Sequence, residues 1–172
     1  GGENNLQKFK TALNPSFSFS PTQKRCINEP ITFNTTTVSF TTIAKFYWDF
    51  GDGSPIDSVN LNPVHVFVPA GDYVVKQRVI GADGCEATNI QNVRIGSIPV
   101  VNFTPNAGYC AGLATSFSAP VTVAVGTVDT TSWVWNLGNG QTSTLPSPSV
   151  TYLTSGNKNV TFSVKTIEGC ES

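Results

Sequence analysis

The sequence predicts an all-β chain made of two tandem β-sandwiches. Three observations support this prediction: the composition, an internal repeat and a series of short strand-like segments. Charged residues make up only 12% of the 172 residues, and threonine is the commonest residue. A chain that is low in charge but rich in β-branched and aromatic residues favours strands and is not typical of disorder.

The internal repeat appears when the chain is shifted along itself by 84 to 87 residues. The sequence WDFGDG at 48–53 then falls on WNLGNG at 135–140, and Cys26 falls on Cys110. Such self-similarity indicates two copies of one module. We therefore expect a leader or the end of a preceding module at 1–14, a first domain at 15–97 and a second domain at 98–172.

Each domain is expected to hold six or seven short strands separated by turns, which is typical of a sandwich. Alternation with period two is clear where Phe46, Trp48 and Phe50 share one face. A helix over 3–13 and a flexible leader both fit the first residues. The expected strands lie at 17–20, 31–35, 46–50, 64–67, 73–80 and 87–95 in the first domain, and at 100–104, 115–119, 133–137, 149–152 and 159–166 in the second.

The composition excludes several classes of function. The net charge is −1 and no basic run is present, so we expect no nucleic-acid partner. No segment approaches the roughly 18 apolar residues that a membrane span needs, so we expect no membrane insertion. The sequence contains no methionine, which indicates a processed or excised piece of a longer polypeptide.

No residues suggest catalysis or a cofactor. His65 is the only histidine, and neither a G-x-S-x-G elbow nor a phosphate-binding glycine loop before a helix is present. A hydrogen-bonded structural role for His65 is therefore favoured over a catalytic one. We expect no enzyme, no cofactor and no metal.

The acidic and tryptophan residues of the repeated motif have two interpretations each. Asp49 and Asp52 would suit a calcium site or a turn in which carboxylates accept backbone N–H groups. The second repeat has asparagine at both positions, which keeps the turn chemistry and loses the charges, so the turn is favoured. Trp48 and Trp135 could serve as sugar platforms, but their alternation with neighbouring residues favours the core.

The four cysteines indicate disulfides, for which three pairings exist. Pairing within each repeat joins Cys26 to Cys85 and Cys110 to Cys170, with nearly equal spans of 59 and 60 residues. This equality favours that pairing over the other two. The alternative, a zinc site, needs Cys or His in close pairs, and these cysteines are solitary. Stable disulfides imply the periplasm, the cell surface or the extracellular space.

The motifs resemble those of the PKD (polycystic kidney disease) domain. The first repeat carries the strand and turn WDFGDG, then HVF at 65–67, then GDYVV at 71–75. The second repeat keeps part of this pattern. The residues that carry the resemblance are Trp48, Asp49, Gly51, Asp52, Gly53, His65, Gly71 and Tyr73, with Trp135, Gly138, Gly140 and Gly156 in the second repeat. The resemblance implies two tandem immunoglobulin-like (PKD-type) β-sandwiches.

The resemblance also implies a non-catalytic extracellular module that spaces or contacts other repeats, surface proteins or glycans. The Gly-Cys that closes each module is similar to modules of large adhesin-type surface proteins of Bacteroidetes, which are exported by type IX secretion. The alternative is a carbohydrate- or protein-binding accessory of a secreted hydrolase. Ser58 and Thr130 lie in triplets that resemble the O-glycosylation sequon of that phylum.

Two segments could contact a partner. The first repeat continues after Cys85 into the expected strand at 87–95, whereas only two residues follow Cys170. We expect the second domain to lack its closing strand and to present an open edge at 159–166. Either the following residues of a longer polypeptide or a strand from another chain would fill that edge. The apolar segment at 120–128 fits a strand of the sandwich or an exposed ridge.

Overall fold

The computed structural model describes residues 13–20, 22–36, 42–106 and 110–172. All regular elements among these residues are strands, which confirms the predicted all-β class. The expected helix or leader at 3–13 lies outside the described residues, apart from Leu13. The chain forms two compact units. The first contains the described residues up to Gln23, Pro30–Val66 and Asp72–Val93, and the second contains Lys24–Glu29, Phe67–Gly71 and Arg94–Ser172.

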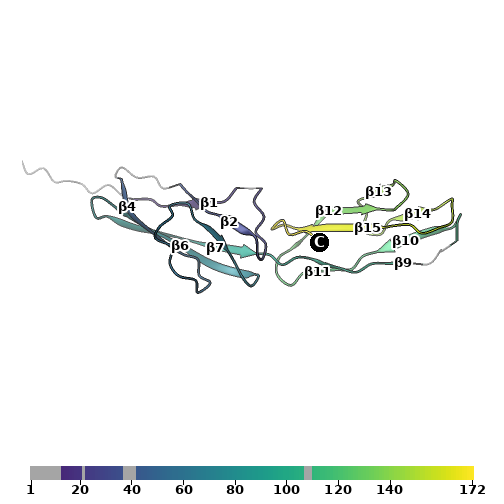
Figure 1. Ribbon diagram of the computed structural model, residues 1–172, viewed down its shortest axis with the longest axis horizontal. Helices are drawn as coiled ribbons and strands as arrows, with labels where there is room; N and C mark the ends of the chain where they lie inside the picture. Colours follow the sequence, from purple (N-terminus) through teal and green to yellow (C-terminus); the bar gives the residue numbers. More distant parts are fainter. Residues whose placement is uncertain (1–12, 21, 37–41, 107–109) are drawn as a thin grey trace, which may run out of the picture. The chain divides into compact units, whose positions relative to one another are not determined.

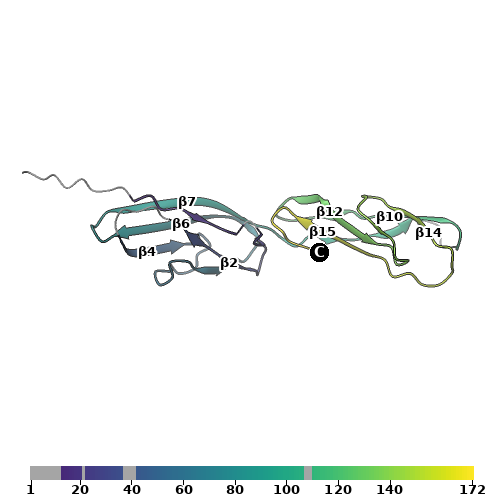
Figure 2. The ribbon, with the colours of Figure 1, turned by 90° about the horizontal axis from the view of Figure 1, so that it is seen from above.

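The first repeat contains a three-stranded sheet in which β6 lies between β4 and β7 (Figure 2). Two further strand pairs, β1 with β3 and β2 with β5, make up the rest of the sandwich. The strands are β1 (Phe17–Ser18), β2 (Pro30–Thr32), β3 (Asn34–Thr35), β4 (Ile43–Asp49), β5 (Val64–Val66), β6 (Gly71–Gly81) and β7 (Glu86–Ile95).

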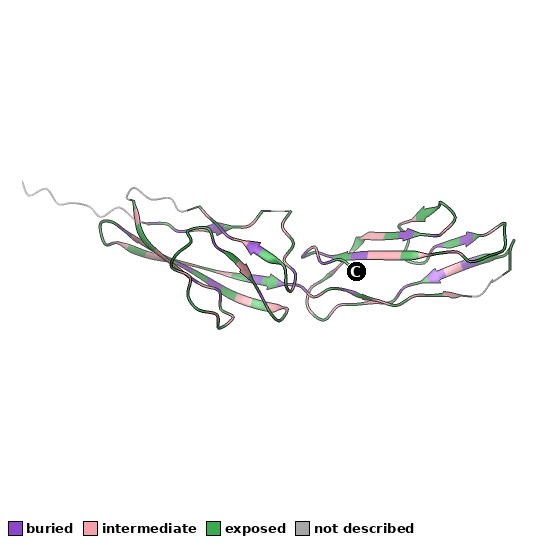
Figure 3. Ribbon diagram, viewed as in Figure 1, coloured by how far each residue is buried: buried purple, intermediate pink, exposed green. Residues whose placement is uncertain are grey.

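Alternating burial along β6 builds the core of this repeat (Figure 3). Val75, Gln77 and Val79 are fully buried, whereas the residues between them are exposed. Gln77 is polar, and its Nε2 donates a hydrogen bond to Thr35 Oγ1 at 2.7 Å. Trp48 is also fully buried. Trp48 lies on the face that the period-two pattern at 46–50 predicts to be buried, whereas Phe46 on the same face is half-buried.

The second repeat contains two three-stranded sheets, β13-β12-β15 and β14-β10-β9, and the pair β11-β8. Figure 1 shows β12 and β15 side by side. The core of the second repeat consists of Phe117, Ala119, Trp135, Leu137 and Val150. The strands are β8 (Val100–Val101), β9 (Thr104–Asn106), β10 (Ala114–Ser118), β11 (Val121–Thr122), β12 (Val128–Asn136), β13 (Thr142–Ser143), β14 (Ser149–Thr151) and β15 (Thr161–Thr166).

The two repeats differ in the strands that pair with β6 in the first repeat and with β15 in the second. In the first repeat, β6 has β4 on one side and β7 on the other. Within the described part of the second repeat, β15 has β12 as its strand neighbour, and an isolated bridge joins Lys165 to Glu171. Whether another strand adds to β15 stays a prediction.

The apolar segment at 120–128 contains β11, a loop and the first residue of β12. Val121, Val123 and Val125 are half-buried, and the residues between them are exposed. The backbone N–H groups of Ala124 and Val125 donate to Ser97 Oγ at 3.1 and 3.0 Å. One side of the segment therefore contributes to packing.

Candidate functional site

The WDFGDG turn of the first repeat is held by carboxylates that accept backbone N–H groups. Asp49 Oδ1 accepts a hydrogen bond from the N–H of Gly51 at 3.0 Å. Asp52 Oδ1 accepts from the N–H of Ser54 at 3.0 Å and from its hydroxyl at 2.6 Å. Short acceptors of this kind close Asx turns. Nowhere in the described part of the chain do three or more His, Cys, Asp or Glu side chains gather as a metal site would require.

The second repeat builds the same turn with asparagine. Asn136 Oδ1 accepts from the N–H of Gly138 at 3.0 Å, and Asn139 Oδ1 accepts from the N–H of Gln141 at 3.0 Å. The amide oxygen therefore replaces the carboxylate oxygen at both positions. This equivalence shows that the turn needs an acceptor but no charge.

Each turn also contains a glycine that no other residue could replace without strain. Gly51 has a φ of 74°, and a Cβ there would lie 2.5 Å from the carbonyl oxygen of Val74. Gly138 has a φ of 71°, and its Cβ would lie 2.6 Å from the carbonyl oxygen of Asn159. Both the positive φ and the close backbone approach require glycine.

His65 joins the first turn to β5. Its Nε2 lies 2.7 Å from Asp52 Oδ2, and its ring stacks on that of Phe50 at a centroid distance of 3.8 Å. Burial raises the pKa of the Asp52 carboxyl, but the hydrogen bonds from Ser54 and His65 outweigh it, so the net pKa is lowered. His65 thus holds the turn against the sandwich.

Asp52→Asn tests this contact through its pH dependence. A carboxyl with a lowered pKa in the folded state stabilises the protein above its unfolded pKa, and that stabilisation is lost as the pH falls through the folded-state value. We expect the substitution to lower the free energy of unfolding by about 1–2 kcal/mol at pH 7 and by less near pH 3. Urea denaturation at both pH values measures this difference.

Asp49→Asn is the matched control, because the Asp49 side chain is 40% exposed and Asn136 keeps the equivalent turn bond in the second repeat. It should change stability by less than about 0.5 kcal/mol. Equal losses for Asp52→Asn at the two pH values would show that the carboxylate charge contributes nothing.

The remaining residues singled out in the sequence lie in structural positions. Trp48 and Trp135 are fully buried, so neither offers a face to a sugar. Tyr152, the equivalent of Phe67 in the second repeat, donates from its hydroxyl to the carbonyl oxygen of Leu137 at 2.7 Å. The sequence signal for this bond is the change from Phe67 in the first repeat to tyrosine in the second, because the change adds a hydroxyl at an equivalent position.

The two sequon-like triplets place exposed hydroxyl residues in Asx turns. Asp57 Oδ1 accepts from the N–H of Val59 at 2.8 Å, and Asp129 Oδ1 accepts from the N–H of Thr131 at 2.9 Å. Ser58 and Thr130 are exposed. Glycosylation at these positions stays a prediction.

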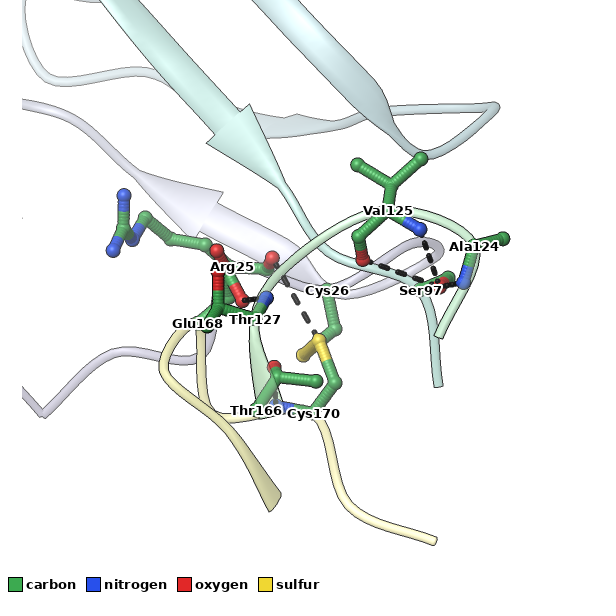
Figure 4. The surroundings of a disulfide bond; sticks show 9 residues. All are labelled: Arg25, Cys26, Ser97, Ala124, Val125, Thr127, Thr166, Glu168 and Cys170. Carbon is green, nitrogen blue, oxygen red and sulfur yellow. Dashed lines mark hydrogen bonds between the residues drawn. A yellow bond between two sulfur atoms is a disulfide. The ribbon is translucent and has the colours of Figure 1, made fainter. Parts of the chain in front are cut away.

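The disulfide joins Cys26 to Cys170, whose Cα atoms lie 5.5 Å apart and which are 144 positions apart in sequence (Figure 4). This bond excludes the predicted Cys26–Cys85 and Cys110–Cys170 pairs, and that prediction is wrong. The reason is the length of β7. The backbone of Cys26 forms an isolated β-bridge with Gly96, which lies just after β7 ends. Cys85, in contrast, lies just before β7 begins.

A strand of 10 residues spans about 33 Å, while the Cα atoms of a disulfide lie within about 7 Å of one another. Cys26 and Cys85 therefore lie at opposite ends of β7. Cys110 and Cys170 are the repeat equivalents of the same two positions. The near-equal spans of 59 and 60 residues reflect the repeat itself and say nothing about pairing.

Backbone hydrogen bonds tie the segment that carries Cys26 to the turn that carries Cys170 and to the residue after β7. The N–H of Arg25 donates to the carbonyl oxygen of Glu168 at 2.9 Å, and the N–H of Gly96 donates to the carbonyl oxygen of Arg25 at 2.8 Å. A Cβ on Gly96 would lie 2.9 Å from Cys170 Sγ. Cys26 and Cys170 are 4% and 1% exposed, so the disulfide is shielded from reductants.

Polar groups around the disulfide complete this site (Figure 4). The N–H of Cys170 donates to Thr166 Oγ1 at 3.2 Å, and the N–H of Thr127 approaches Glu168 Oε2 at 3.4 Å. Glu168 is buried, with 6% of its surface exposed. The site fixes one turn of the second repeat against a segment that precedes β2 in sequence.

A cavity of about 450 Å³ lies in the second repeat. Its lining includes aromatic, aliphatic, hydroxyl and cationic groups from β10 and from the loop after β14. Cys110, which is exposed, also lies on its wall. The lining residues used below are Cys110, Thr115, Tyr152 and Lys158.

Comparison with protein families gives two adjacent matches, both to the PKD domain, over residues 13–95 and 96–172. The chain belongs to the PKD domain family. These matches confirm the resemblance carried by the WDFGDG motif and extend it to the second repeat, where both acids are absent. PKD domains are typical of extracellular or secreted proteins, and the shielded disulfide agrees with such an environment.

Two solved PKD domains each match about half of this chain. The PKD1 domain of Vibrio anguillarum Epp is 20% identical and covers 49% of this chain and 94% of its own, with a TM-score of 0.42. The PKD1 domain of the Vibrio cholerae metalloprotease PrtV is 20% identical, with coverages of 48% and 93% and a TM-score of 0.39.

The fibronectin(III)-like modules of Clostridium thermocellum CbhA match over 92% of this PKD tandem and 89% of their own chain, at 14% identity and a TM-score of 0.54. This similarity shows the immunoglobulin-like sandwich fold. In the described part of the chain, no helix has the length and apolar character of a membrane span.

Proposed function

We propose that this PKD tandem is a non-catalytic, load-bearing spacer in an extracellular protein. One observation supports the proposal above all others: the disulfide closes residues 26 to 170 into a covalent loop. Tension applied to the two ends of the chain then passes through the disulfide. All the strands except β1 lie inside the loop, so their hydrogen bonds carry little of that load.

The backbone contacts around the disulfide suit this role. The segment before β2 and the turn after β15 are joined by the Arg25–Glu168 hydrogen bond as well as by the covalent bond. Both cysteines are buried, so a soluble reductant reaches them slowly. A spacer with this arrangement keeps its length under force as long as the disulfide stays oxidised.

Single-molecule stretching of the chain between end handles tests the proposal. Only residues 1–25 and 171–172 lie outside the loop, so the oxidised chain should gain at most about 100 Å of contour length. After reduction, the 144-residue separation should add about 500 Å as the sandwiches unfold.

A chain with Cys85→Ser and Cys110→Ser is the matched control and should behave like the unmodified chain. Equal extensions of the oxidised and reduced chains would overturn the proposal. Extension of the oxidised chain far beyond 100 Å would do the same.

The finer assignment that we propose is an adhesive or spacing module at the surface of a bacterial cell. The similarity of its Gly-Cys closure to Bacteroidetes surface proteins, which use type IX secretion, supports it. We also propose that the edge of β15 accepts a strand, from the residues that follow in a longer polypeptide or from another chain. The pairing of β6 with β7 in the first repeat supports this addition.

The cavity of the second repeat supports a second candidate function, which is recognition of a glycan or protein by an accessory module of a secreted hydrolase. It combines the aromatic ring of Tyr152 with the cation of Lys158 and the hydroxyl of Thr115. Such mixtures of apolar and polar groups are typical of ligand sites. Titration of glycans and soluble extracellular proteins against the chain, followed by calorimetry, distinguishes this candidate from a plain spacer.

A further inference from the structure

The second repeat holds the only Asn-Gly pair of the sequence, Asn139-Gly140, in the turn between β12 and β13. In such a pair the side-chain amide is open to attack by the next backbone nitrogen, because glycine has no Cβ to hinder the approach. Both residues are exposed, so water reaches the amide. The reactivity of the pair therefore depends on how the turn places the two reacting groups.

The Asx turn directs the Asn139 side chain forward along the chain. Its Oδ1 accepts a hydrogen bond from the N–H of Gln141 at 3.0 Å, and its Nδ2 donates to Gln141 Oε1 at 3.0 Å. Because Oδ1 reaches the nitrogen two residues ahead, the Cγ atom lies over the intervening nitrogen, that of Gly140. Attack on Cγ places negative charge on Oδ1, and the N–H of Gln141 already donates to that oxygen and stabilises the charge.

The backbone nitrogen of Gly140 is available for this attack. Within the described part of the chain, its N–H has no hydrogen-bond acceptor. Gly140 has a φ of 86°, and no atom lies within 4 Å of the place that a Cβ would occupy. The peptide between the two residues therefore has room to rotate toward the side chain.

Asn136 provides an internal comparison, because it forms the same Asx bond in the same turn. Its Oδ1 accepts from the N–H of Gly138 at 3.0 Å. The next nitrogen belongs to Leu137, whose N–H donates to the carbonyl oxygen of Gln141 at 2.9 Å. The Leu137 side chain is buried in the core. Hydrogen bonding and packing thus hold this nitrogen away from Asn136, whereas neither holds the nitrogen that follows Asn139.

We propose that Asn139 is a spontaneous deamidation site of the folded chain. The Gly140 nitrogen gives its proton to solvent base and attacks Asn139 Cγ to form a cyclic succinimide. The Cγ–Nδ2 bond breaks, and the nitrogen takes up a proton and leaves as ammonia. Water then opens the ring, at Cγ to give aspartate or at the backbone carbonyl carbon to give isoaspartate. The sum is hydrolysis of one amide by one water, with no oxidation or reduction.

The aspartate product reproduces the first repeat, in which the equivalent residue is Asp52. Asp52 Oδ1 accepts from the N–H of Ser54 at 3.0 Å, so a carboxylate at position 139 keeps the equivalent bond from Gln141. The isoaspartate product instead routes the backbone through the former side chain, which breaks the Asx turn. The second repeat thereby gains, with time, the negative charge that the first repeat carries from the start.

Incubation of the oxidised full chain at mildly alkaline pH tests the proposal, with circular dichroism confirming that the chain stays folded. Peptide mapping by mass spectrometry locates the mass gain that accompanies replacement of an –NH2 group by –OH. Conversion at Asn139 should exceed that at Asn136 by roughly tenfold or more. The rate should rise with pH, because the attacking nitrogen must lose its proton.

Two controls accompany this measurement. A synthetic peptide with the sequence of residues 134–143 reports the reactivity of the pair without the fold, and the Asn139→Gln chain should stay unconverted because its longer side chain closes a larger ring. A folded chain that remains unconverted while the peptide reacts would show that the turn protects Asn139, and the proposal would then fail. Equal conversion at Asn136 and Asn139 in the folded chain would also refute it.

Discussion

Replacement of both Cys26 and Cys170 by serine is expected to lower the free energy of unfolding by about 5 kcal/mol. The disulfide closes a loop of 144 residues, and closing a longer loop removes more conformational entropy from the unfolded chain. Both sulfurs are buried, so the substitution also leaves two hydroxyl groups in a shielded site. Urea denaturation followed by circular dichroism measures the loss.

Reduction of the unmodified chain provides the first control, because it removes the bond without changing a side chain. It should reproduce most of the destabilisation. The chain with Cys85→Ser and Cys110→Ser provides the second control and should unfold within about 1 kcal/mol of the unmodified chain. A loss of similar size in this control would contradict the assignment of the bond to Cys26 and Cys170.

Trp135→Ala should cost the second repeat about 4 kcal/mol. The side chain is fully buried. Its ring packs against Phe162 and Phe103 at centroid distances of 4.3 and 5.2 Å, and its Nε1 donates to the carbonyl oxygen of Leu145 at 3.0 Å. The substitution therefore opens a large cavity and also leaves a carbonyl without its donor. Thermal unfolding monitored by calorimetry measures the effect.

Val134→Ala is the matched control on the same strand, because Val134 is 49% exposed. Its cost should stay below about 1 kcal/mol. Trp135→Phe should recover much of the packing but not the hydrogen bond. A similar cost for Val134→Ala and Trp135→Ala would show that the predicted face of β12 does not form the core.

The sequence was sufficient for the fold because the signals that decide it are local. Alternation around Trp48 and Trp135 assigned the buried face of β4 and β12, and glycine with Asp or Asn marked the turns that follow them. Because the sequence is duplicated, each of these strands and turns was predicted twice from different residues. Asn136 and Asn139 showed which features of the motif the turn requires.

The pairing of the cysteines depends on which strand ends lie close together in space. The alternation of apolar and polar residues along a strand does not give that information. Equal spans within repeats are a consequence of duplication, so they would arise for pairing across repeats as well. The available signal was the position of Cys85 in the turn before a long strand, at the far end from Gly96. The contact between Asp52 and His65 was also not predictable, because thirteen positions of loop and strand separate them.

The way in which the disulfide connects repeats bears on how such a protein could evolve. When the cysteine near the start of one repeat bonds to the cysteine near the end of the next, as Cys26 does with Cys170, any two adjacent repeats carry a complementary pair. Recombination that inserts or deletes one whole repeat then preserves a complementary pair at each new boundary, and no compensating mutation is needed. The length of the protein can change by gene duplication while its covalent pattern is inherited intact.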